Sequence, residues 1–433
     1  MDYRLSRYSY LFRDSSGGYH AFSTRSRARL DLEESVYTIL QEAQKGQHPL
    51  DQSHGFFDTL RKCKLAVEDW EDDTYMYQIL HESLLRSYNQ DILSLVLAPT
   101  TQCNFRCGYC FEPAKDHRVM SDEVEDALIR FVEGKKKTSK SLDLLWYGGE
   151  PLMALERIAS ILTRIRENGL PLIRHSIITN GYYFGEKAIR LFKEFPLNEI
   201  QITFDGDRKR HNSIRKDFRT GAPSYDAILE NTIRVHRELP ETLLSVRVNI
   251  DRKNQEQFQA LRQELYNLIG QKRVNVYPGI LRTDAPDGLS LGGAAMERHE
   301  SAQFAGKLIN CAACGSAYPQ KARKVCTANR INSYIIGPEG EIYKCWNDVT
   351  DPAKVVGSIV SGQITNLRLL MDYQFGTNWA ENAKCRTCFL LPLCYGGCPW
   401  YRLRNLREGA HFNLCTEYTN QEFLQQCILS CSL

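Results

Sequence analysis

The chain has 433 residues and a formal net charge of +3, with 42% hydrophobic and 25% charged residues. This length allows two or three domains, and the near-neutral charge gives no indication of a nucleic-acid partner. No stretch approaches the roughly 18 continuous apolar residues of a membrane span, and the N-terminus lacks the apolar core of a signal peptide, so we expect a cytoplasmic protein without a membrane partner.

Residues 1–90 are expected to form a small separate domain. Two aromatic-rich stretches, Tyr8 to Phe12 and Tyr19 to Phe22, flank the turn-forming residues Ser15 to Gly18, and this pattern predicts a β-hairpin. Apolar residues at helical spacing predict three helices, one beginning near Leu32 and two more around 56–63 and 75–88. The unit is either a plain cap or a binding module.

Residues 91–310 alternate between strand, loop and helix, which is typical of a parallel sheet with crossover helices. The six apolar runs predicted as strands are Ile92–Ala98, Leu142–Tyr147, His175–Thr179, Ile200–Phe204, Leu244–Ile250 and Val274–Tyr277. Six such units predict an α/β fold, a partial (β/α)6 TIM-like barrel rather than a closed barrel of eight strands. The loops at the carboxyl ends of these strands should carry the chemistry.

The most unusual motif follows the first of these strands. Residues 101–111 read TQCNFRCGYCF and place Cys103, Cys107 and Cys110 in the spacing CxxxCxxC. Three thiolates are one short of the four that enclose an ordinary 4Fe-4S cluster, so a cluster here would leave one iron open to a ligand. A zinc site with His117 as the nearby fourth ligand is the alternative.

This motif, with the aromatic Tyr109 before its third cysteine, resembles the signature of the radical S-adenosylmethionine (SAM) enzymes. The resemblance implies that Cys103, Cys107 and Cys110 are catalytic residues whose 4Fe-4S cluster binds SAM. A small reductant such as flavodoxin or ferredoxin would then supply the electron that cleaves SAM to methionine and a 5′-deoxyadenosyl radical.

The same resemblance implies SAM contacts at the following strand ends. The backbone of Gly148, Gly149 and Glu150 would hold the amino group, because glycines allow a close backbone approach. Asn180 and Thr203 would lie near the ribose and methionine, and Arg215 would lie near the carboxylate, which suits a guanidinium fork. Read without the resemblance, these residues are a tight turn, strand and loop residues, and a surface salt-bridge arginine.

Residues 311–433 are rich in cysteine, which in a cytoplasmic chain indicates metal rather than disulfides. The spacing from Cys326 through Gly340 and Cys345 to CxxCxxxxxCxxxC and Cys415 resembles the SPASM extension of radical SAM maturases. A hairpin over 334–342 would present Cys326 and Cys345. The resemblance implies two auxiliary 4Fe-4S clusters, three in all, with these ligands: Cys385, Cys388, Cys394 and Cys415 for one, and Cys326, Cys345 and Cys398 for the other.

The fourth ligand of that second set is expected to be Cys314, or failing that Cys311, and otherwise a substrate thiolate. Two zinc sites are the alternative for the whole region. Cys63, Cys427 and Cys431 are expected to be buried or free structural thiols.

Taken together, these resemblances imply a peptide maturase. The first 90 residues resemble the winged-helix-like domain with which such enzymes capture a leader peptide at a sheet edge. The substrate would be a ribosomally made precursor peptide, cross-linked by a thioether, ether or carbon-carbon bond. One alternative is an anaerobic sulfatase-maturing enzyme that makes formylglycine. Such enzymes place an acid beside the second auxiliary cysteine, where this chain has Trp346 and then Asp348. The other is a non-catalytic iron-sulfur electron carrier or leader-binding partner.

Overall fold

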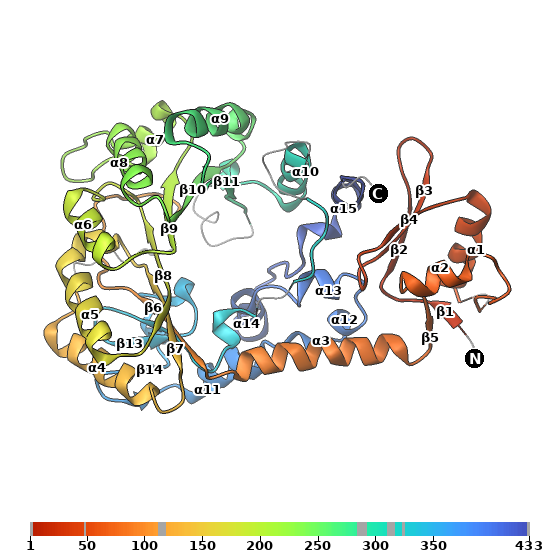
Figure 1. Ribbon diagram of the computed structural model, residues 1–433, viewed down its shortest axis with the longest axis horizontal. Coiled ribbons are helices and arrows are strands. Elements are labelled where there is room, and N and C mark those ends of the chain that lie inside the picture. Colours follow the sequence, from red (N-terminus) through yellow and green to blue (C-terminus); the bar gives the residue numbers. More distant parts are fainter. Residues whose placement is uncertain are drawn as a thin grey trace. The chain divides into compact units, whose positions relative to one another are not determined.

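The computed structural model describes residues 3–46, 49–110, 118–283, 292–309, 317–322 and 325–430. The chain forms two compact units (Figure 1). The first unit comprises residues 1–87, 298–326 and 375–433, and the second comprises 88–297 and 327–374. Residues 327–374, which the sequence analysis places in the C-terminal domain, thus belong to the second unit. The division into three domains stays a prediction.

The second unit is built on a sheet whose central strands are parallel and follow sequence order. All six predicted strands are confirmed: β6 (Ile92–Leu97), β7 (Ser141–Trp146), β8 (Leu172–Thr179), β9 (Glu199–Phe204), β10 (Leu243–Ile250) and β11 (Val274–Ile280). Helices cover one face of the sheet and the other face points into the barrel, so side chains on both faces of a strand are buried. Strand β6 shows this, because all five residues from Leu93 to Leu97 are buried, and such strands therefore appear in the sequence as unbroken apolar runs. The predicted α/β partial barrel is therefore correct.

The sheet continues beyond β6 with four strands that the barrel prediction did not include. The hairpin of β12 (Ser333–Ile336) and β13 (Glu341–Tyr343) confirms the prediction for 334–342, and Gly340 takes φ +82° at its turn. Strand β12 pairs in parallel with β6, and β13 continues to β14 (Gly357–Ser358) and β15 (Gln363–Ile364). The hairpin thus occupies the edge of β6.

Helices between the strands lie along the outer face of the sheet (Figure 1). They are α4 (Asp122–Lys135), α5 (Leu155–Asn168), α6 (Glu186–Glu194), α7 (Arg208–Ile214), α8 (Tyr225–Glu238) and α9 (Phe258–Ile269), and a short α11 (Leu367–Met371) follows β15. Ser121 caps the N-terminus of α4, because its hydroxyl accepts a hydrogen bond from the Val124 amide, and Gly169 caps the C-terminus of α5 in the left-handed conformation.

The N-terminal part of the first unit contains the predicted hairpin and helices. Strands β2 (Ser9–Arg13) and β3 (Tyr19–Ser23) form the hairpin, and β4 (Arg29–Leu32) extends it to three strands. A separate pair joins β1 (Tyr3–Leu5) to β5 (Ala66–Glu68). The helices are α1 (Glu34–Gln44), α2 (Phe57–Lys62) and α3 (Glu71–Tyr88), and leucines such as Leu40, Leu60 and Leu65 form the core between them.

The C-terminal part of the first unit shares cores with that N-terminal part. Its helices are α10 (Arg298–Ile309), α12 (Ala383–Arg386), α13 (Leu391–Cys394), α14 (Pro399–Arg407) and α15 (Gln421–Leu429). Phe12 and Phe22 of the hairpin pack in one cluster with Leu393 and Ile428. Thr24 donates to the carbonyl of Phe389 at 2.5 Å. The N-terminal residues therefore complete their packing only with residues from the end of the chain.

Candidate active site

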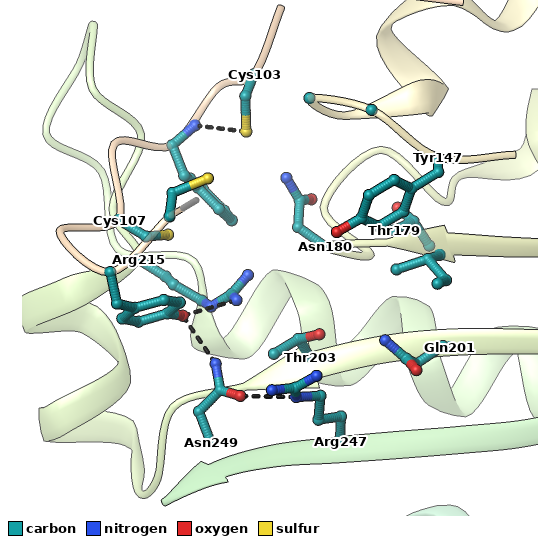
Figure 2. A pocket seen from close by; sticks show the side chains of 16 residues that line it. Cys103, Cys107, Tyr147, Thr179, Asn180, Gln201, Thr203, Arg215, Arg247 and Asn249 are labelled. Atoms are coloured by element: carbon teal, nitrogen blue, oxygen red, sulfur yellow. Dashed lines mark hydrogen bonds between the residues drawn. The ribbon is translucent and has the colours of Figure 1, made fainter. Parts of the chain in front are cut away.

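A pocket lies at the carboxyl ends of the parallel strands, where the loops that follow them meet (Figure 2). Its walls come from the cysteine loop after β6, from the ends of β7 to β10 and from one residue beyond α7. The lining residues are Cys103, Phe105, Cys107, Tyr109, Cys110, Tyr147, Gly148, Gly149, Ile178, Thr179, Asn180, Gln201, Thr203, Arg215, Arg247 and Asn249. Eight of the nine residues predicted for this site line the pocket, and Glu150 does not.

The three predicted cysteines share this pocket. All three thiols are partly accessible, and the backbone N–H of Phe105 donates to the Cys103 sulfur at 3.4 Å. The backbone amide of Cys110 donates to the Cys107 carbonyl at 3.1 Å, and this turn fixes the relative positions of the second and third cysteines. Within the described ranges, no three His, Cys, Asp or Glu side chains are grouped so as to hold a metal ion. His117, the alternative ligand, lies outside the described residues.

Gly148 and Gly149 bring the end of β7 against the cysteine loop. The Gly149 amide donates to the Thr100 carbonyl at 3.1 Å, and the Glu150 amide donates to the Gln102 carbonyl at 2.7 Å. A Cβ atom on Gly149 would lie 2.2 Å from the Gln102 carbonyl oxygen, closer than any real side chain comes. The pair of glycines is therefore required by close backbone contact. The role of their carbonyls toward a ligand stays a prediction.

The Glu150 side chain lies behind the pocket wall. It is fully buried, and its carboxylate accepts hydrogen bonds from the Leu152 amide at 3.0 Å, the Thr179 hydroxyl at 2.6 Å and the Asn180 amide at 2.7 Å. Burial raises the pKa of this carboxyl, and the three hydrogen bonds oppose the shift. Glu150 thus braces the loop after β8. Asn180 in turn donates to the Asn104 side chain at 2.8 Å, which ties that loop to the cysteine loop.

Arg215 belongs to a buried polar network beneath the cysteine loop. Its Nε donates to Asp205 at 2.6 Å and its Nη2 donates to the Tyr109 hydroxyl at 2.8 Å. The Tyr109 hydroxyl donates to Asp205 at 2.6 Å, and the side-chain amide of Asn249 donates to Asp205 at 2.8 Å. The remaining terminal nitrogen of Arg215, Nη1, has no hydrogen-bond partner within the part of the chain that the structure describes.

The charges in this network follow from its burial. Burial by itself would raise the pKa of Asp205, but the Arg215 guanidinium and the hydrogen bonds from Tyr109 and Asn249 lower it. Burial raises the pKa of the Tyr109 hydroxyl well above its ordinary value. The network therefore holds an ionised carboxylate against a guanidinium, beside a neutral tyrosine. A cation is fixed in place at the pocket before any ligand arrives.

Sequence reasoning missed the polar residues on the barrel wall. Gln201 accepts from the Tyr277 hydroxyl at 2.7 Å, and the Arg247 Nε donates to the Asn249 side chain at 2.9 Å. Gly279 on the neighbouring strand leaves room for Arg247, since a Cβ there would lie 2.1 Å from its Nε. Gln201 and Arg247 each precede a pocket residue by two positions. That period of two at the ends of apolar strands is the signal that would have found them.

The four cysteines predicted to hold one auxiliary cluster, Cys385, Cys388, Cys394 and Cys415, all lie within the first unit. Burial raises the pKa of Cys388 and of Cys394, and the neighbouring thiols of Cys415 and Cys385 raise both further, which places the four groups within electrostatic range. Arg402 contacts the Cys385 sulfur at 3.6 Å and donates to the Gly396 carbonyl at 2.6 Å. Their role as one cluster's ligands stays a prediction.

The second predicted set of auxiliary ligands draws on both compact units, so it stays a prediction as well. Cys326 and Cys398 belong to the first unit, whereas Cys345 is buried in the second. Cys314 and Cys311, the two candidates for the fourth position, lie outside the described residues.

The residues that follow Cys345 bear on the two peptide-modifying alternatives. Trp346 is 41% exposed, and its ring centre lies 5.9 Å from that of Tyr147 in the pocket wall. Asp348 is only 2% exposed and accepts from the Tyr373 hydroxyl at 2.5 Å. The segment after Cys345 therefore presents an indole toward Tyr147, while its carboxylate is buried.

Comparisons with known proteins agree with this geometry. Residues 97–265 match the Radical SAM superfamily. The chain is 22% identical over 349 residues to a serine-type anaerobic sulfatase-maturating enzyme from Klebsiella aerogenes, across 73% of this chain and 80% of that enzyme. A 28% match over 145 residues to the Synechocystis protein sll1766 covers 31% of this chain and 35% of that protein.

Two solved structures share the fold at low sequence identity. The structure of anSMEcpe with bound AdoMet has a TM-score of 0.57 and 17% identity, and it matches 78% of this chain and 93% of that chain. The structure of Streptococcus suis SuiB bound to precursor peptide SuiA has a TM-score of 0.54 and 14% identity, and it matches 96% of this chain and 99% of that chain.

Proposed function

Because this chain is a radical SAM enzyme of the SPASM type, we propose that it modifies a ribosomally made precursor peptide. The product is an intramolecular cross-link, through a thioether, ether or carbon-carbon bond. The observation that carries this proposal is the pocket that joins Cys103, Cys107 and Cys110 to the Gly148-Gly149 backbone and to Arg215. We place the reaction in the cytoplasm. No helix within the described residues has the length and apolar character that a membrane crossing requires.

The residues of the pocket fit the groups that this reaction needs. We assign Cys103, Cys107 and Cys110 as the ligands of a 4Fe-4S cluster with one open iron. SAM is assigned to the Gly148 and Gly149 backbone, to Asn180 and Thr203 on the far wall, and to Arg215 for its carboxylate. Arg215 lines the pocket and its Nη1 group has hydrogens to donate, which supports that last assignment.

The protein's contribution is positioning and shielding. When bound, the cluster and SAM supply a 5′-deoxyadenosyl radical by one-electron cleavage of SAM, and this radical removes hydrogen from an unactivated carbon. Asp205 and Tyr109 fix the Arg215 guanidinium beforehand, so binding an anionic group requires little reorganisation. The cysteines from Cys326 to Cys415 are assigned as ligands of two auxiliary clusters, which would supply an acceptor for the electron that remains when the new bond forms.

We assign peptide capture to the three-stranded sheet of the N-terminal part. Strands β2 and β4 are its two edges, and no described strand pairs with the outer side of either. An extended leader peptide adding to one edge would satisfy the backbone groups there. The match to SuiB, solved with its precursor peptide, covers 96% of this chain against 78% for anSMEcpe, which supports a shared N-terminal part.

Formylglycine formation is the second candidate, because the Klebsiella aerogenes relative is a sulfatase-maturating enzyme. That reading would place Asp348 as the acid near the substrate. The burial of Asp348 and its hydrogen bond from Tyr373 favour a structural role instead, and Trp346 is the residue at the exposed position. These contacts favour the cross-linking proposal.

The reaction is tested by product mass. Full-length enzyme reconstituted with iron and sulfide is incubated without oxygen with SAM, dithionite and the precursor encoded beside its gene. The expected product is lighter by about two hydrogens per cross-link, with 5′-deoxyadenosine released in step, and lacks fragments between the joined residues. A product with a free aldehyde would establish the formylglycine alternative. An unmodified peptide would contradict both.

Leader capture is tested separately by hydrogen exchange. Adding precursor to the full chain should slow exchange of the backbone amides in 9–13 or in 29–32, because strand addition gives one edge new hydrogen-bond partners. The amides of β3, already paired on both sides, serve as the internal control. Unchanged exchange at both edges, under conditions where the precursor is modified, would place leader capture elsewhere.

A further inference from the structure

A cluster of exposed cations surrounds an exposed aromatic side chain beside the cysteine loop. We call these residues the basic patch: Arg106, Lys209, Lys216, Phe218 and Arg219. All five are exposed, and Phe218 keeps 39% of its surface accessible. Lys209 lies on α7, and Ser213 near the end of that helix lines a small cavity together with Arg106 and Gly108.

The basic patch is attached directly to the loop that carries the cluster ligands. Arg106 donates through Nη1 to the carbonyl of Cys103 at 2.6 Å and to that of Phe105 at 2.9 Å. The backbone amide of Phe218 donates to the Asn104 carbonyl at 3.0 Å. The Arg106 guanidinium lies 3.8 Å from the Phe218 ring centre, and that of Arg219 lies at 5.5 Å. A molecule seated on Phe218 therefore rests against the backbone around Cys103.

The charge of the patch is only partly offset by the acids around it, since the buried carboxylate of Asp217 lies within electrostatic range of Arg219. Three neighbouring arginines are neutralised by ion pairs, namely Arg208 with Asp226, Arg210 with Asp251 and Arg215 with Asp205. The four cations of the patch make no salt bridge with any described residue. Asp207, an exposed acid of this segment, caps α7 by accepting a hydrogen bond from the backbone amide of Arg210. The surface is therefore positive and attracts an acidic partner over about a Debye length.

We propose that the basic patch is the docking surface for an acidic one-electron carrier of the flavodoxin or ferredoxin class. This inference rests on the proposed function, which requires an electron to enter at the cluster of Cys103. Donation of one electron leaves a flavodoxin hydroquinone as the semiquinone, or oxidises a ferredoxin cluster once. That electron balances cleavage of one S–C5′ bond of SAM. The positive charge of the patch would attract the acidic carrier and speed its association, and Phe218 would provide an apolar contact in the complex.

Charge reversal tests the proposal in the full-length reconstituted enzyme. The variant carries Lys209→Glu, Lys216→Glu and Arg219→Glu, none of which contacts the pocket. The control carries Lys137→Glu, Lys140→Glu and Lys272→Glu, three exposed lysines near the opposite, amino ends of β7 and β11. Purified acidic flavodoxin and ferredoxin serve as separate probes. Their binding is measured by calorimetry at low salt, and 5′-deoxyadenosine formation is measured with each carrier and with dithionite.

The patch variant should bind at least one carrier about tenfold or more weakly, and carrier-driven 5′-deoxyadenosine formation should fall similarly. With dithionite, both variants should match the wild type, and rising salt should weaken wild-type binding but not dithionite turnover. Unchanged carrier affinity would overturn the proposal. Equal loss with carrier and dithionite would show that the patch supports the cluster site instead. Wild-type enzyme that forms no 5′-deoxyadenosine with dithionite would instead refute the proposed function.

Loss of precursor or nucleic-acid binding with unchanged carrier binding would assign the patch to that other partner and would also overturn the proposal. The melting temperature of each variant is compared with that of the wild type. Because all six substituted residues are exposed, both variants should fold normally.

Discussion

Replacing Gly149 with alanine should separate cluster binding from folding. The added Cβ would lie 2.2 Å from the Gln102 carbonyl oxygen and 2.5 Å from that of Thr101, where about 3.4 Å is ordinary contact. The cysteine loop must therefore shift by about 1 Å. Overpacking of this kind costs about 1–3 kcal/mol, and two backbone hydrogen bonds of about 1 kcal/mol each are strained, so the local cost is about 3–5 kcal/mol.

The loop should move rather than the sheet, because the strands on either side are anchored by parallel pairing. We therefore expect Gly149→Ala to lose about a third of its iron, roughly four of twelve atoms, together with SAM cleavage. Iron and sulfide are assayed after anaerobic reconstitution. The matched control is Gly134→Ala in α4, where no atom lies within 4 Å of the new Cβ. It should stabilise the helix by about 0.5–1 kcal/mol without loss of iron. Full iron content and wild-type SAM cleavage in Gly149→Ala would refute the close-contact argument.

Three further outcomes follow from the site and its surroundings. Replacing Cys103, Cys107 and Cys110 together with alanine should remove about a third of the iron and abolish SAM cleavage, and a protein loaded with stoichiometric zinc would contradict this. Burial lowers the pKa of His175 from 6.5 to about 4, so the unfolded chain binds a proton at this residue more readily than the folded chain does. The folded state should therefore keep its full stability above pH 6.5 and lose about 2 kcal/mol of unfolding free energy by pH 5. In His175→Gln the melting temperature should depend less on pH over this range. Asp348→Asn should leave the product mass unchanged, because the side chain is buried against Tyr373, whereas loss of product with retained SAM cleavage would support the formylglycine alternative.

The barrel strands could be predicted because each carries its own signal, an apolar run such as Leu93–Leu97 between turn residues. Strands β1 and β5 could not be predicted. They have three residues each and pair Tyr3 with Glu68, so their only stabilising partner is distant in sequence. Short segments of this kind have no local periodicity to detect.

In the predicted site, too, some features have a local sequence signal and others depend on contacts between distant segments. Cys103 and Gly149 were identifiable from their motifs and Arg215 from the family resemblance, and the pocket contains all three. The anchoring of Arg215 by Asp205 and Tyr109 depends on contacts between three loops, and no sequence pattern specifies those contacts. Glu150 belongs to the recognised motif, yet its burial against Thr179 gives it a bracing contact that the motif alone does not reveal.

The shared core of the first unit has a consequence for synthesis of the chain. Tyr8, Phe12 and Phe22 pack against residues such as Leu391 and Ile428, which leave the ribosome more than 360 positions later. At about 5–20 residues per second, those aromatic side chains wait roughly 20 to 70 s for their partners. During that interval the nascent hairpin is a target for chaperones and a nucleus for aggregation. Overexpression should therefore yield more folded protein when translation is slowed or chaperones are co-produced, and a circular permutant that joins the two termini should shorten the wait.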